Sequence, residues 1–232
     1  MLVRDPSLVL ELFRGKHKPN GRMCLLEAVA YVAGEPWGDN PACVSPVLAT
    51  FGRGWNDGMR SNAERASLLQ YIPLLVGTLA SPEVERRRGY MALEWLVRRH
   101  TVAWLRAAGL NDHATAIAGL AQVDTPAAIS AINAAWDDAG DANGDAALGP
   151  AAGDAACAAA WAGGWPNVWP AARITSWAAA GAAIKAVGWD ALQPTVLMLQ
   201  AEAHQLFHAM ITATGPQARR ARSEMNTYSD EV

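Results

Sequence analysis

A hydroxyl residue followed directly by proline occurs three times in this chain, at Ser45-Pro46, Ser81-Pro82 and Thr125-Pro126. Ser and Thr are preferred N-caps of α-helices, and the fixed backbone angle of proline suits the first helical position. Each pair therefore predicts the start of a helix. Gly34 and Gly109 follow apolar segments with helical spacing, and they predict left-handed helix ends.

Helical periodicity accounts for most of the chain. It predicts helices over residues 22–33, 46–58, 82–108, from 126 past Trp136, and 195–213. No sustained alternation of apolar and polar residues, bounded by turn residues, predicts a strand. We therefore expect an all-α protein, a single-domain helical bundle.

Composition varies along the chain without an evident linker. The apolar fraction of 51% in 232 residues is enough for a sizeable core. Residues 139–189 are rich in Ala and Trp, and the last residues are polar. We predict one α-helical domain over residues 1–215 with an Ala/Trp-rich C-terminal half, a soft boundary near 137–150, and a polar tail over 216–232.

Charge and cysteine content limit the function classes. The formal net charge is −3, and the arginines at positions 86–88, 98, 99 and 106 are interleaved with acids, which is typical of a solvated helix face. Three cysteines are too few for a disulfide framework. No segment has the apolar run of a signal peptide or a membrane span. We expect a cytoplasmic protein that binds neither nucleic acid nor membrane.

Five of the ten tryptophans are separated by multiples of four residues, Trp161, Trp165, Trp169, Trp177 and Trp189. One interpretation is an aromatic face that binds a ligand. The other is that these rings fill gaps between closely packed Ala-rich helices. We favour it because regularly spaced apolar residues belong to a hydrophobic core more often than to a binding site. Pro166 and Pro170 also interrupt any continuous helix through the five positions.

The densest cluster of reactive side chains lies in residues 23–46. Cys24 and Glu27 are one helical turn apart and share a helix face with Tyr31. Beyond Gly34, a loop restricted by prolines presents two acids and an aromatic ring, Glu35, Asp39 and Trp37. Acids held in a rigid loop beside an aromatic ring are common in binding sites.

Two interpretations of these acids stay open. In the first, Glu27, Glu35 and Asp39 are acid–base carboxylates, and the residues that bind the ligand are Tyr31, Trp37, Asn56 and Asp57. Such catalysis requires one carboxyl group whose pKa is raised by burial or by a like charge. In the second, the acids accept backbone N–H groups and shape the loop, which is the more frequent role of acids in turns. The sequence does not decide whether the protein is an enzyme.

Metal and cofactor chemistry has less support. Cys24 and Cys43 lack the short paired spacing of a structural zinc site. His204 and His208 form an i, i+4 pair, but no Glu follows His204 as the H-E-x-x-H pattern requires. Phosphate-binding, dinucleotide-binding and nucleophile-elbow motifs are absent from the sequence. We expect neither a metal nor a cofactor.

Residues 24–46 follow the pattern C-x-x-E-A-x-x-Y-x-A-G-E-P-W-x-D-x-P-x-C-x-x-P. It is followed by W-N-D at positions 55–57, by Arg65 before a Leu-Leu pair, and by V-G-T at positions 76–78. Over residues 23–78 the chain resembles a family of uncharacterised proteins from actinobacteria and their phages. The resemblance implies a phage or mobile-element setting and supplies no substrate.

Two functions of different class remain. The first, which we favour, is a phage-type helical interaction protein that binds a host or phage protein partner through a Trp-bearing surface. It predicts an exposed apolar patch that contains Trp. The second is a small-molecule-binding protein or an enzyme that uses carboxylates on the loop of residues 34–46. It predicts that Glu27, Glu35 and Asp39 converge in one pocket lined by Trp37.

Overall fold

The computed structural model describes residues 5, 9, 11–19, 21–139 and 151–213, and their regular structure is entirely helical. The α-helices are α1 (Leu25–Ala33), α2 (Pro46–Gly58), α3 (Asn62–Arg65), α4 (Ile72–Leu75), α5 (Pro82–Trp95), α6 (Val102–Ala107), α7 (Asn111–Ala118), α8 (Pro126–Ala139), α9 (Ala151–Ala162), α10 (Trp169–Val187) and α11 (Gln193–Thr212). Short 3-10 helices span Ala66–Tyr71 and Asp190–Leu192. The all-α prediction is confirmed.

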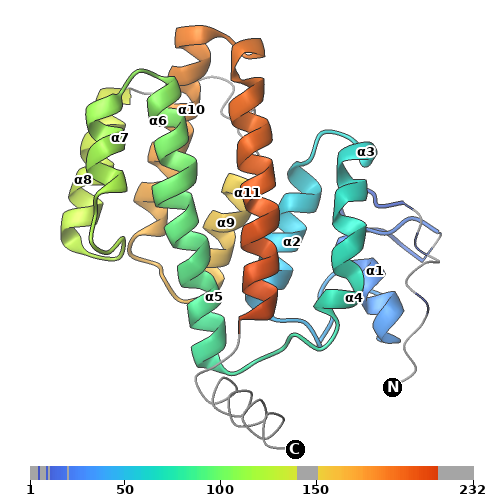
Figure 1. Cartoon of the computed structure of the whole chain (residues 1–232). Coiled ribbons are helices and arrows are strands. Elements are labelled where there is room, and N and C mark those ends of the chain that lie inside the picture. Colours follow the sequence, from blue (N-terminus) through green and yellow to red (C-terminus); the bar gives the residue numbers. More distant parts are fainter. Residues whose placement is uncertain (1–4, 6–8, 10, 20, 140–150, 214–232) are drawn as a thin grey trace, which may run out of the picture.

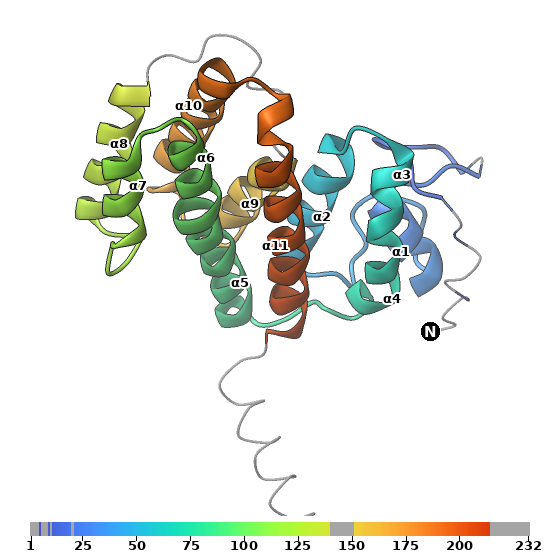
Figure 2. The same ribbon diagram turned by 45° about the horizontal axis from the view of Figure 1, so that its top comes forward.

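The long helices stand side by side in one bundle. In Figure 1, α5 and α6 form one rod beside α11, with α9 and α10 behind them, α7 and α8 on one flank and α1 to α4 on the other. Figure 2 shows the same grouping from a second direction. Within the described residues, no helix is both long enough and apolar enough to cross a membrane.

The helix boundaries follow from cap chemistry. Ser45 accepts the Leu48 N–H, and Thr125 accepts the Ala128 N–H, so both hydroxyls cap the helices that were predicted to start there. Gly34 and Gly109 have φ angles of 69° and 80°, which confirms the left-handed ends. The first helix begins at Leu25, later than the predicted residue 22.

The helix predicted over residues 82–108 is continuous but changes type in the middle. A π-helical segment, Leu96–Thr101, joins α5 to α6. The rod runs antiparallel to α11: Arg88 Nε donates to the Met210 carbonyl at 2.9 Å, and Arg99 bonds Glu202 further along. Arg88 also forms an ion pair with Glu85 at 2.9 Å, so its charge is paired inside the bundle.

Small residues let the backbone of α9 lie close to the backbones of α2 and α5. A Cβ added to Gly58 would lie 2.4 Å from the Ala151 Cβ, and one added to Gly89 would lie 2.6 Å from the Gly163 Cα. The Ala-rich composition of this half is therefore explained by close helix packing, because a larger side chain would push the backbones apart.

Residues from both halves of the chain share one core. Phe51 of α2 stacks on Phe207 of α11 with ring centroids 5.0 Å apart, and Thr175 of α10 donates to the Ile132 carbonyl of α8. The predicted division into one domain and a polar tail stays a prediction. Residues 140–150, within the soft boundary, and the tail over 216–232 lie outside the described residues.

The tryptophans divide into buried and surface groups. Trp55, Trp95 and Trp104 lie in the core. Of the five with regular spacing, Trp161 is 57% exposed and the other four are half-buried. The helical register is interrupted as predicted, because α9 ends at Ala162 and α10 starts at Trp169. The gap-filling interpretation is wrong for Trp161, whose ring faces solvent.

His100 of the π-helical segment is fully buried in this core. Its Nδ1 lies 2.7 Å from Ser176 Oγ, and Trp104 Nε1 donates to its Nε2 at 3.3 Å. Because Nε2 accepts, the ring proton sits on Nδ1 and is donated to Ser176. Burial lowers the pKa of His100 to about 3, so the ring is neutral in the folded protein.

We expect His100 to make the protein less stable as the pH falls from about 6.5 toward 3. In this window an unfolded histidine binds a proton and the folded one does not, so the free energy of unfolding should drop by roughly 1 kcal/mol per pH unit. Urea unfolding at several pH values measures the slope. His100→Gln should flatten it, and the exposed-site control His208→Gln should not. An equal slope in wild type and His100→Gln would contradict this assignment.

Candidate functional site

The helix of the 23–46 segment begins with a capping box built on Cys24. The Cys24 side chain accepts the Glu27 backbone N–H, and the Glu27 carboxylate accepts the Cys24 N–H at 2.9 Å. This position usually holds Ser or Thr, so the thiol takes the place of a hydroxyl. Burial raises the pKa of Cys24 to about 12, which leaves it a neutral thiol and a poor nucleophile.

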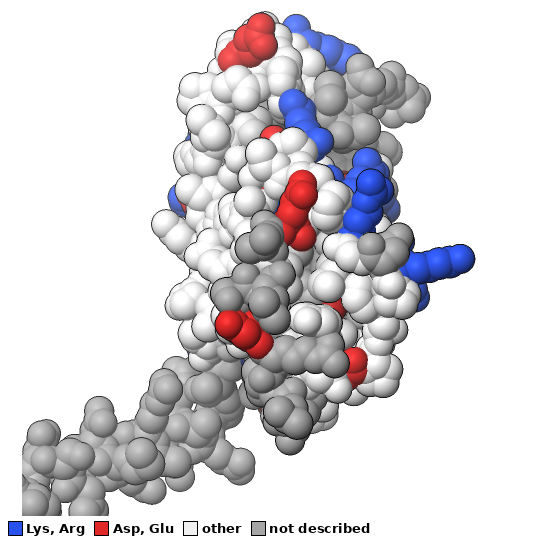
Figure 3. All heavy atoms as spheres, turned by 90° about the vertical axis from the view of Figure 1, so that its right-hand side faces the viewer, with Lys and Arg blue, Asp and Glu red and all other residues white. Residues whose placement is uncertain are grey.

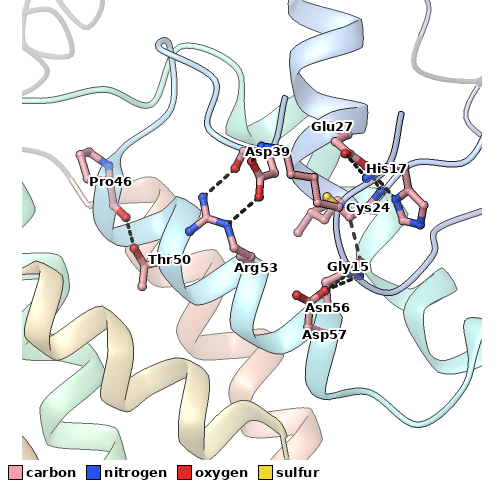
Figure 4. A network of polar contacts seen from close by, with 12 residues as sticks. Gly15, His17, Cys24, Glu27, Asp39, Pro46, Thr50, Arg53, Asn56 and Asp57 are labelled. Atoms are coloured by element: carbon pink, nitrogen blue, oxygen red, sulfur yellow. Dashed lines mark hydrogen bonds and ion pairs between the residues drawn. The ribbon is translucent and has the colours of Figure 1, made fainter. Parts of the chain in front are cut away.

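Glu27 also holds the segment that precedes α1 (Figure 4). Its carboxylate accepts the His17 backbone N–H at 2.6 Å and pairs with His17 Nδ1 at 2.9 Å, while its own side chain is fully buried. Trp37 Nε1 donates to the His17 carbonyl at 2.8 Å. Glu27 and Trp37 therefore fix the chain around His17 against α1.

Asn56 and Asp57 at the end of α2 hold the same N-terminal segment. Asn56 accepts the Leu25 N–H at 3.3 Å and donates to the Phe13 carbonyl at 3.0 Å. Asp57 accepts the Gly15 N–H at 2.8 Å. The two predicted ligand-binding residues therefore bond protein backbone and each other.

Glu35 closes the loop that follows α1. Its carboxylate accepts the Ala42 N–H at 2.6 Å and the Cys43 N–H at 2.9 Å. Two charge-assisted bonds to successive amides fix the turn in the way expected of a structural acid.

Asp39 lies on the side of the loop that faces α2. It pairs with Lys16 at 3.3 Å and with Arg53 Nε at 3.7 Å, and its carbonyl accepts Arg53 Nη2 at 2.6 Å. In Figure 4 the Asp39 and Glu27 side chains point to different sides. All three acids already have protein partners: Glu27 and Glu35 accept backbone N–H groups, and Asp39 pairs with two cations. Tyr31 is half-buried on α1 against the core.

The other candidate clusters are also engaged in packing. Within the described residues, no group of three or more His, Cys, Asp and Glu side chains could hold a metal ion. His204 stacks on Tyr71, with its Nδ1 2.9 Å from the tyrosine hydroxyl. Arg98 pairs with Glu94 at 2.6 Å. Figure 3 shows basic and acidic side chains together on the face that carries α1, α3 and α4.

A groove between α2, α9 and α10 was not identified from the sequence. It encloses about 610 Å³ and is lined by Gly54, Asp154, Cys157, Ala158, Trp161, Trp169 and Arg173. A Cβ added to Gly54 would lie 3.2 Å from the Ala155 Cα, so α2 and α9 touch at the base of the groove. We name this feature the Trp161 groove.

Two tryptophans give the Trp161 groove its aromatic wall. Trp161 and Trp169 meet edge to face, with centroids 5.7 Å apart and an interplanar angle of 71°. Trp169 Nε1 is buried and has no hydrogen-bond partner among the described residues. Because this nitrogen is enclosed by protein, the part of Trp169 that faces the groove is its apolar ring surface.

Charged groups stand at the rim of the Trp161 groove. The Arg173 guanidinium lies 4.0 Å above the Trp177 ring, and Asp154 accepts the Trp177 Nε1 N–H at 2.9 Å. Arg173 Nε is 3.9 Å from Asp154. Inside the groove, burial raises the pKa of Cys157 to about 12, which makes this thiol an apolar lining group. The groove therefore combines an apolar wall with a fixed pair of opposite charges.

The Trp161 groove had a partial signal in the sequence, the regular tryptophan spacing. That spacing did not show that the chain turns between Ala162 and Trp169, which is what brings Trp161 onto Trp169. In comparisons with known proteins, no family model, no curated protein and no solved structure matches this chain.

Proposed function

We propose that this protein is a phage-type helical interaction protein that binds a host or phage protein partner through the Trp161 groove. The observation that carries the proposal is Trp161, a large aromatic side chain that is 57% exposed at the edge of a concave, Trp-lined surface. The phage setting rests only on the resemblance of residues 23–78.

The chemistry of the Trp161 groove fits a peptide segment with an apolar anchor. Trp and Arg are enriched among the residues that dominate binding energy at protein interfaces. An apolar side chain from the partner would cover Trp161 and pack against the Trp169 ring. The Asp154–Arg173 pair would then select the orientation of the segment, because it offers both signs of charge at one rim.

The alternative, catalysis or small-molecule binding by the loop carboxylates, has less support. Glu27 and Glu35 are both bonded to backbone N–H groups, so a reacting group would have to displace structural bonds. A small molecule in the Trp161 groove is a separate outcome, because pockets of this volume also hold small ligands.

A site-specific crosslinking experiment tests the proposal. A photoreactive phenylalanine analogue replaces Trp161 in one variant and the exposed Lys185 of α10 in the control. We expect one protein partner to crosslink at position 161 and not at 185. The purified partner is then titrated by calorimetry: Trp161→Ala should weaken binding more than tenfold, whereas Leu79→Ala, at an exposed leucine outside the groove, should not. Equal affinity of Trp161→Ala and wild type would contradict the proposal.

A further inference from the structure

A second cavity lies between α6 and the first half of α11, apart from the Trp161 groove. It encloses about 390 Å³ and is lined by Arg98, Arg99, Val102, Ala103, Arg106, Ala107, Thr195, Met198 and Glu202. The residues from the rod fall on one helix face, and those from α11 fall at i, i+3 and i+7. Arg106 of α6 and Thr195 of α11 both line this cavity. We name this feature the Arg106 cavity.

The charges around the Arg106 cavity do not cancel. Arg98 is paired with Glu94, and Arg99 is paired with Glu202. Arg106, in contrast, is exposed and forms no ion pair or hydrogen bond with any residue that the structure describes. The three arginines and two glutamates leave one positive charge, and it is carried by the arginine with free N–H donors.

A second donor faces the same space. Thr195, in the first turn of α11, is half-buried, and its hydroxyl has no hydrogen-bond partner among the described residues. Near the end of α6, the carbonyls of Trp104, Leu105 and Arg106 already accept backbone N–H groups, from Ala108, Leu110 and Gly109. Arg106 and Thr195 therefore present unpaired donors to one cavity.

The remaining lining is apolar. Val102, Ala103 and Ala107 form one wall, and Met198, which is 44% exposed, forms the other. A methionine side chain adapts its shape to an apolar partner at low cost. An inorganic anion would use the donors but would leave this wall uncovered.

We propose that the Arg106 cavity binds a small amphipathic carboxylate, with its carboxylate on Arg106 and Thr195 and its hydrocarbon body against Val102 and Met198. A guanidinium matches a carboxylate in planar, two-bond geometry. One uncompensated positive charge suits a monoanion better than a phosphate dianion. The site is independent of the proposed partner binding, since the two cavities share no lining residue.

Calorimetric titration of the full chain with three probes tests this proposal. Octanoate should bind at one site with a dissociation constant below about 1 mM and weaken as salt is added. Octanol, which lacks the charge, and inorganic phosphate, which lacks the apolar body, should each bind at least about tenfold more weakly. Octanol binding as tight as octanoate, or no saturable octanoate binding, would overturn the assignment.

Variants locate the octanoate site. Arg106→Gln should weaken octanoate binding about tenfold or more, and Thr195→Val by a smaller factor. Arg86→Gln is the matched control, because Arg86 is another exposed arginine but lies over Trp165, outside the cavity. Circular dichroism checks that every variant is folded. If Arg106→Gln binds octanoate as wild type does, the proposal is wrong.

Discussion

Glu27→Ala should lower the free energy of unfolding by about 3–5 kcal/mol, the range seen when one partner is removed from a buried charged network. The carboxylate accepts three donors, from the Cys24 N–H and from the backbone and ring nitrogens of His17. Alanine leaves these donors without their acceptor, and the segment around His17 loses its attachment to α1. Urea unfolding followed by circular dichroism measures the loss.

Two variants make the Glu27 result specific. Glu27→Gln keeps one acceptor oxygen and should cost less than Glu27→Ala. Asp39→Asn should stay within about 1 kcal/mol of wild type, because its ion pairs with Lys16 and Arg53 are partly exposed. A catalytic carboxylate is often held under strain, so unchanged or increased stability of Glu27→Ala would argue for a functional role instead.

Gly89→Ala should destabilise the protein by about 3 kcal/mol, and Gly89→Val should prevent folding. The new Cβ would lie 2.6 Å from the Gly163 Cα, and because the obstacle is backbone, α5 and α9 would have to separate. This loss exceeds the gain in helix propensity of about 1 kcal/mol that alanine brings. Chemical denaturation of Gly89→Ala measures the net effect.

The same Gly→Ala change at two less crowded positions separates the steric cost from the general effect of replacing glycine. Gly54→Ala brings a Cβ to 3.2 Å from the Ala155 Cα and should have a smaller cost. Gly38→Ala meets nothing within 4 Å and should be close to neutral. The expected order of cost is therefore Gly89, Gly54, Gly38. If Gly89→Ala costs no more than Gly54→Ala, the contact between α5 and α9 is looser than the structure indicates.

Local chemistry explains which parts of the fold could be predicted. Ser45 and Thr125 satisfy N–H groups three residues ahead, so both helix starts could be predicted from a few neighbouring residues. The start at Leu25 had the same kind of signal, since C-x-x-E is a capping box with a thiol in place of a hydroxyl. The π-helical segment has no comparable local pattern.

Contacts between distant residues explain what could not be predicted. The partners of Glu27 include His17, ten positions earlier, and no periodic pattern links the two. The close approach of α2 and α9 places Gly58 against Ala151, a residue that is distant in the sequence. Composition indicated small residues in this half but not which backbone they would touch.

The candidate site was predicted only in part. The loop after Gly34 was predicted, and the alternative in which the acids bind backbone N–H groups matches Glu27 and Glu35. Trp161 was included in the tryptophan series, but its exposure depends on the turn between α9 and α10. That turn reverses the chain, and residue spacing along one helix cannot describe it.

Calorimetric affinities of the crosslinked partner for two single variants test the proposed interface most directly. Trp161→Ala removes the exposed aromatic side chain of the groove, and Asp39→Asn neutralises the loop acid that pairs with Lys16 and Arg53. For the proposed interface, we expect Trp161→Ala to weaken binding more than tenfold and Asp39→Asn to stay within about twofold of wild type. The opposite pattern, with binding lost in Asp39→Asn and kept in Trp161→Ala, would contradict it and place the function on the loop.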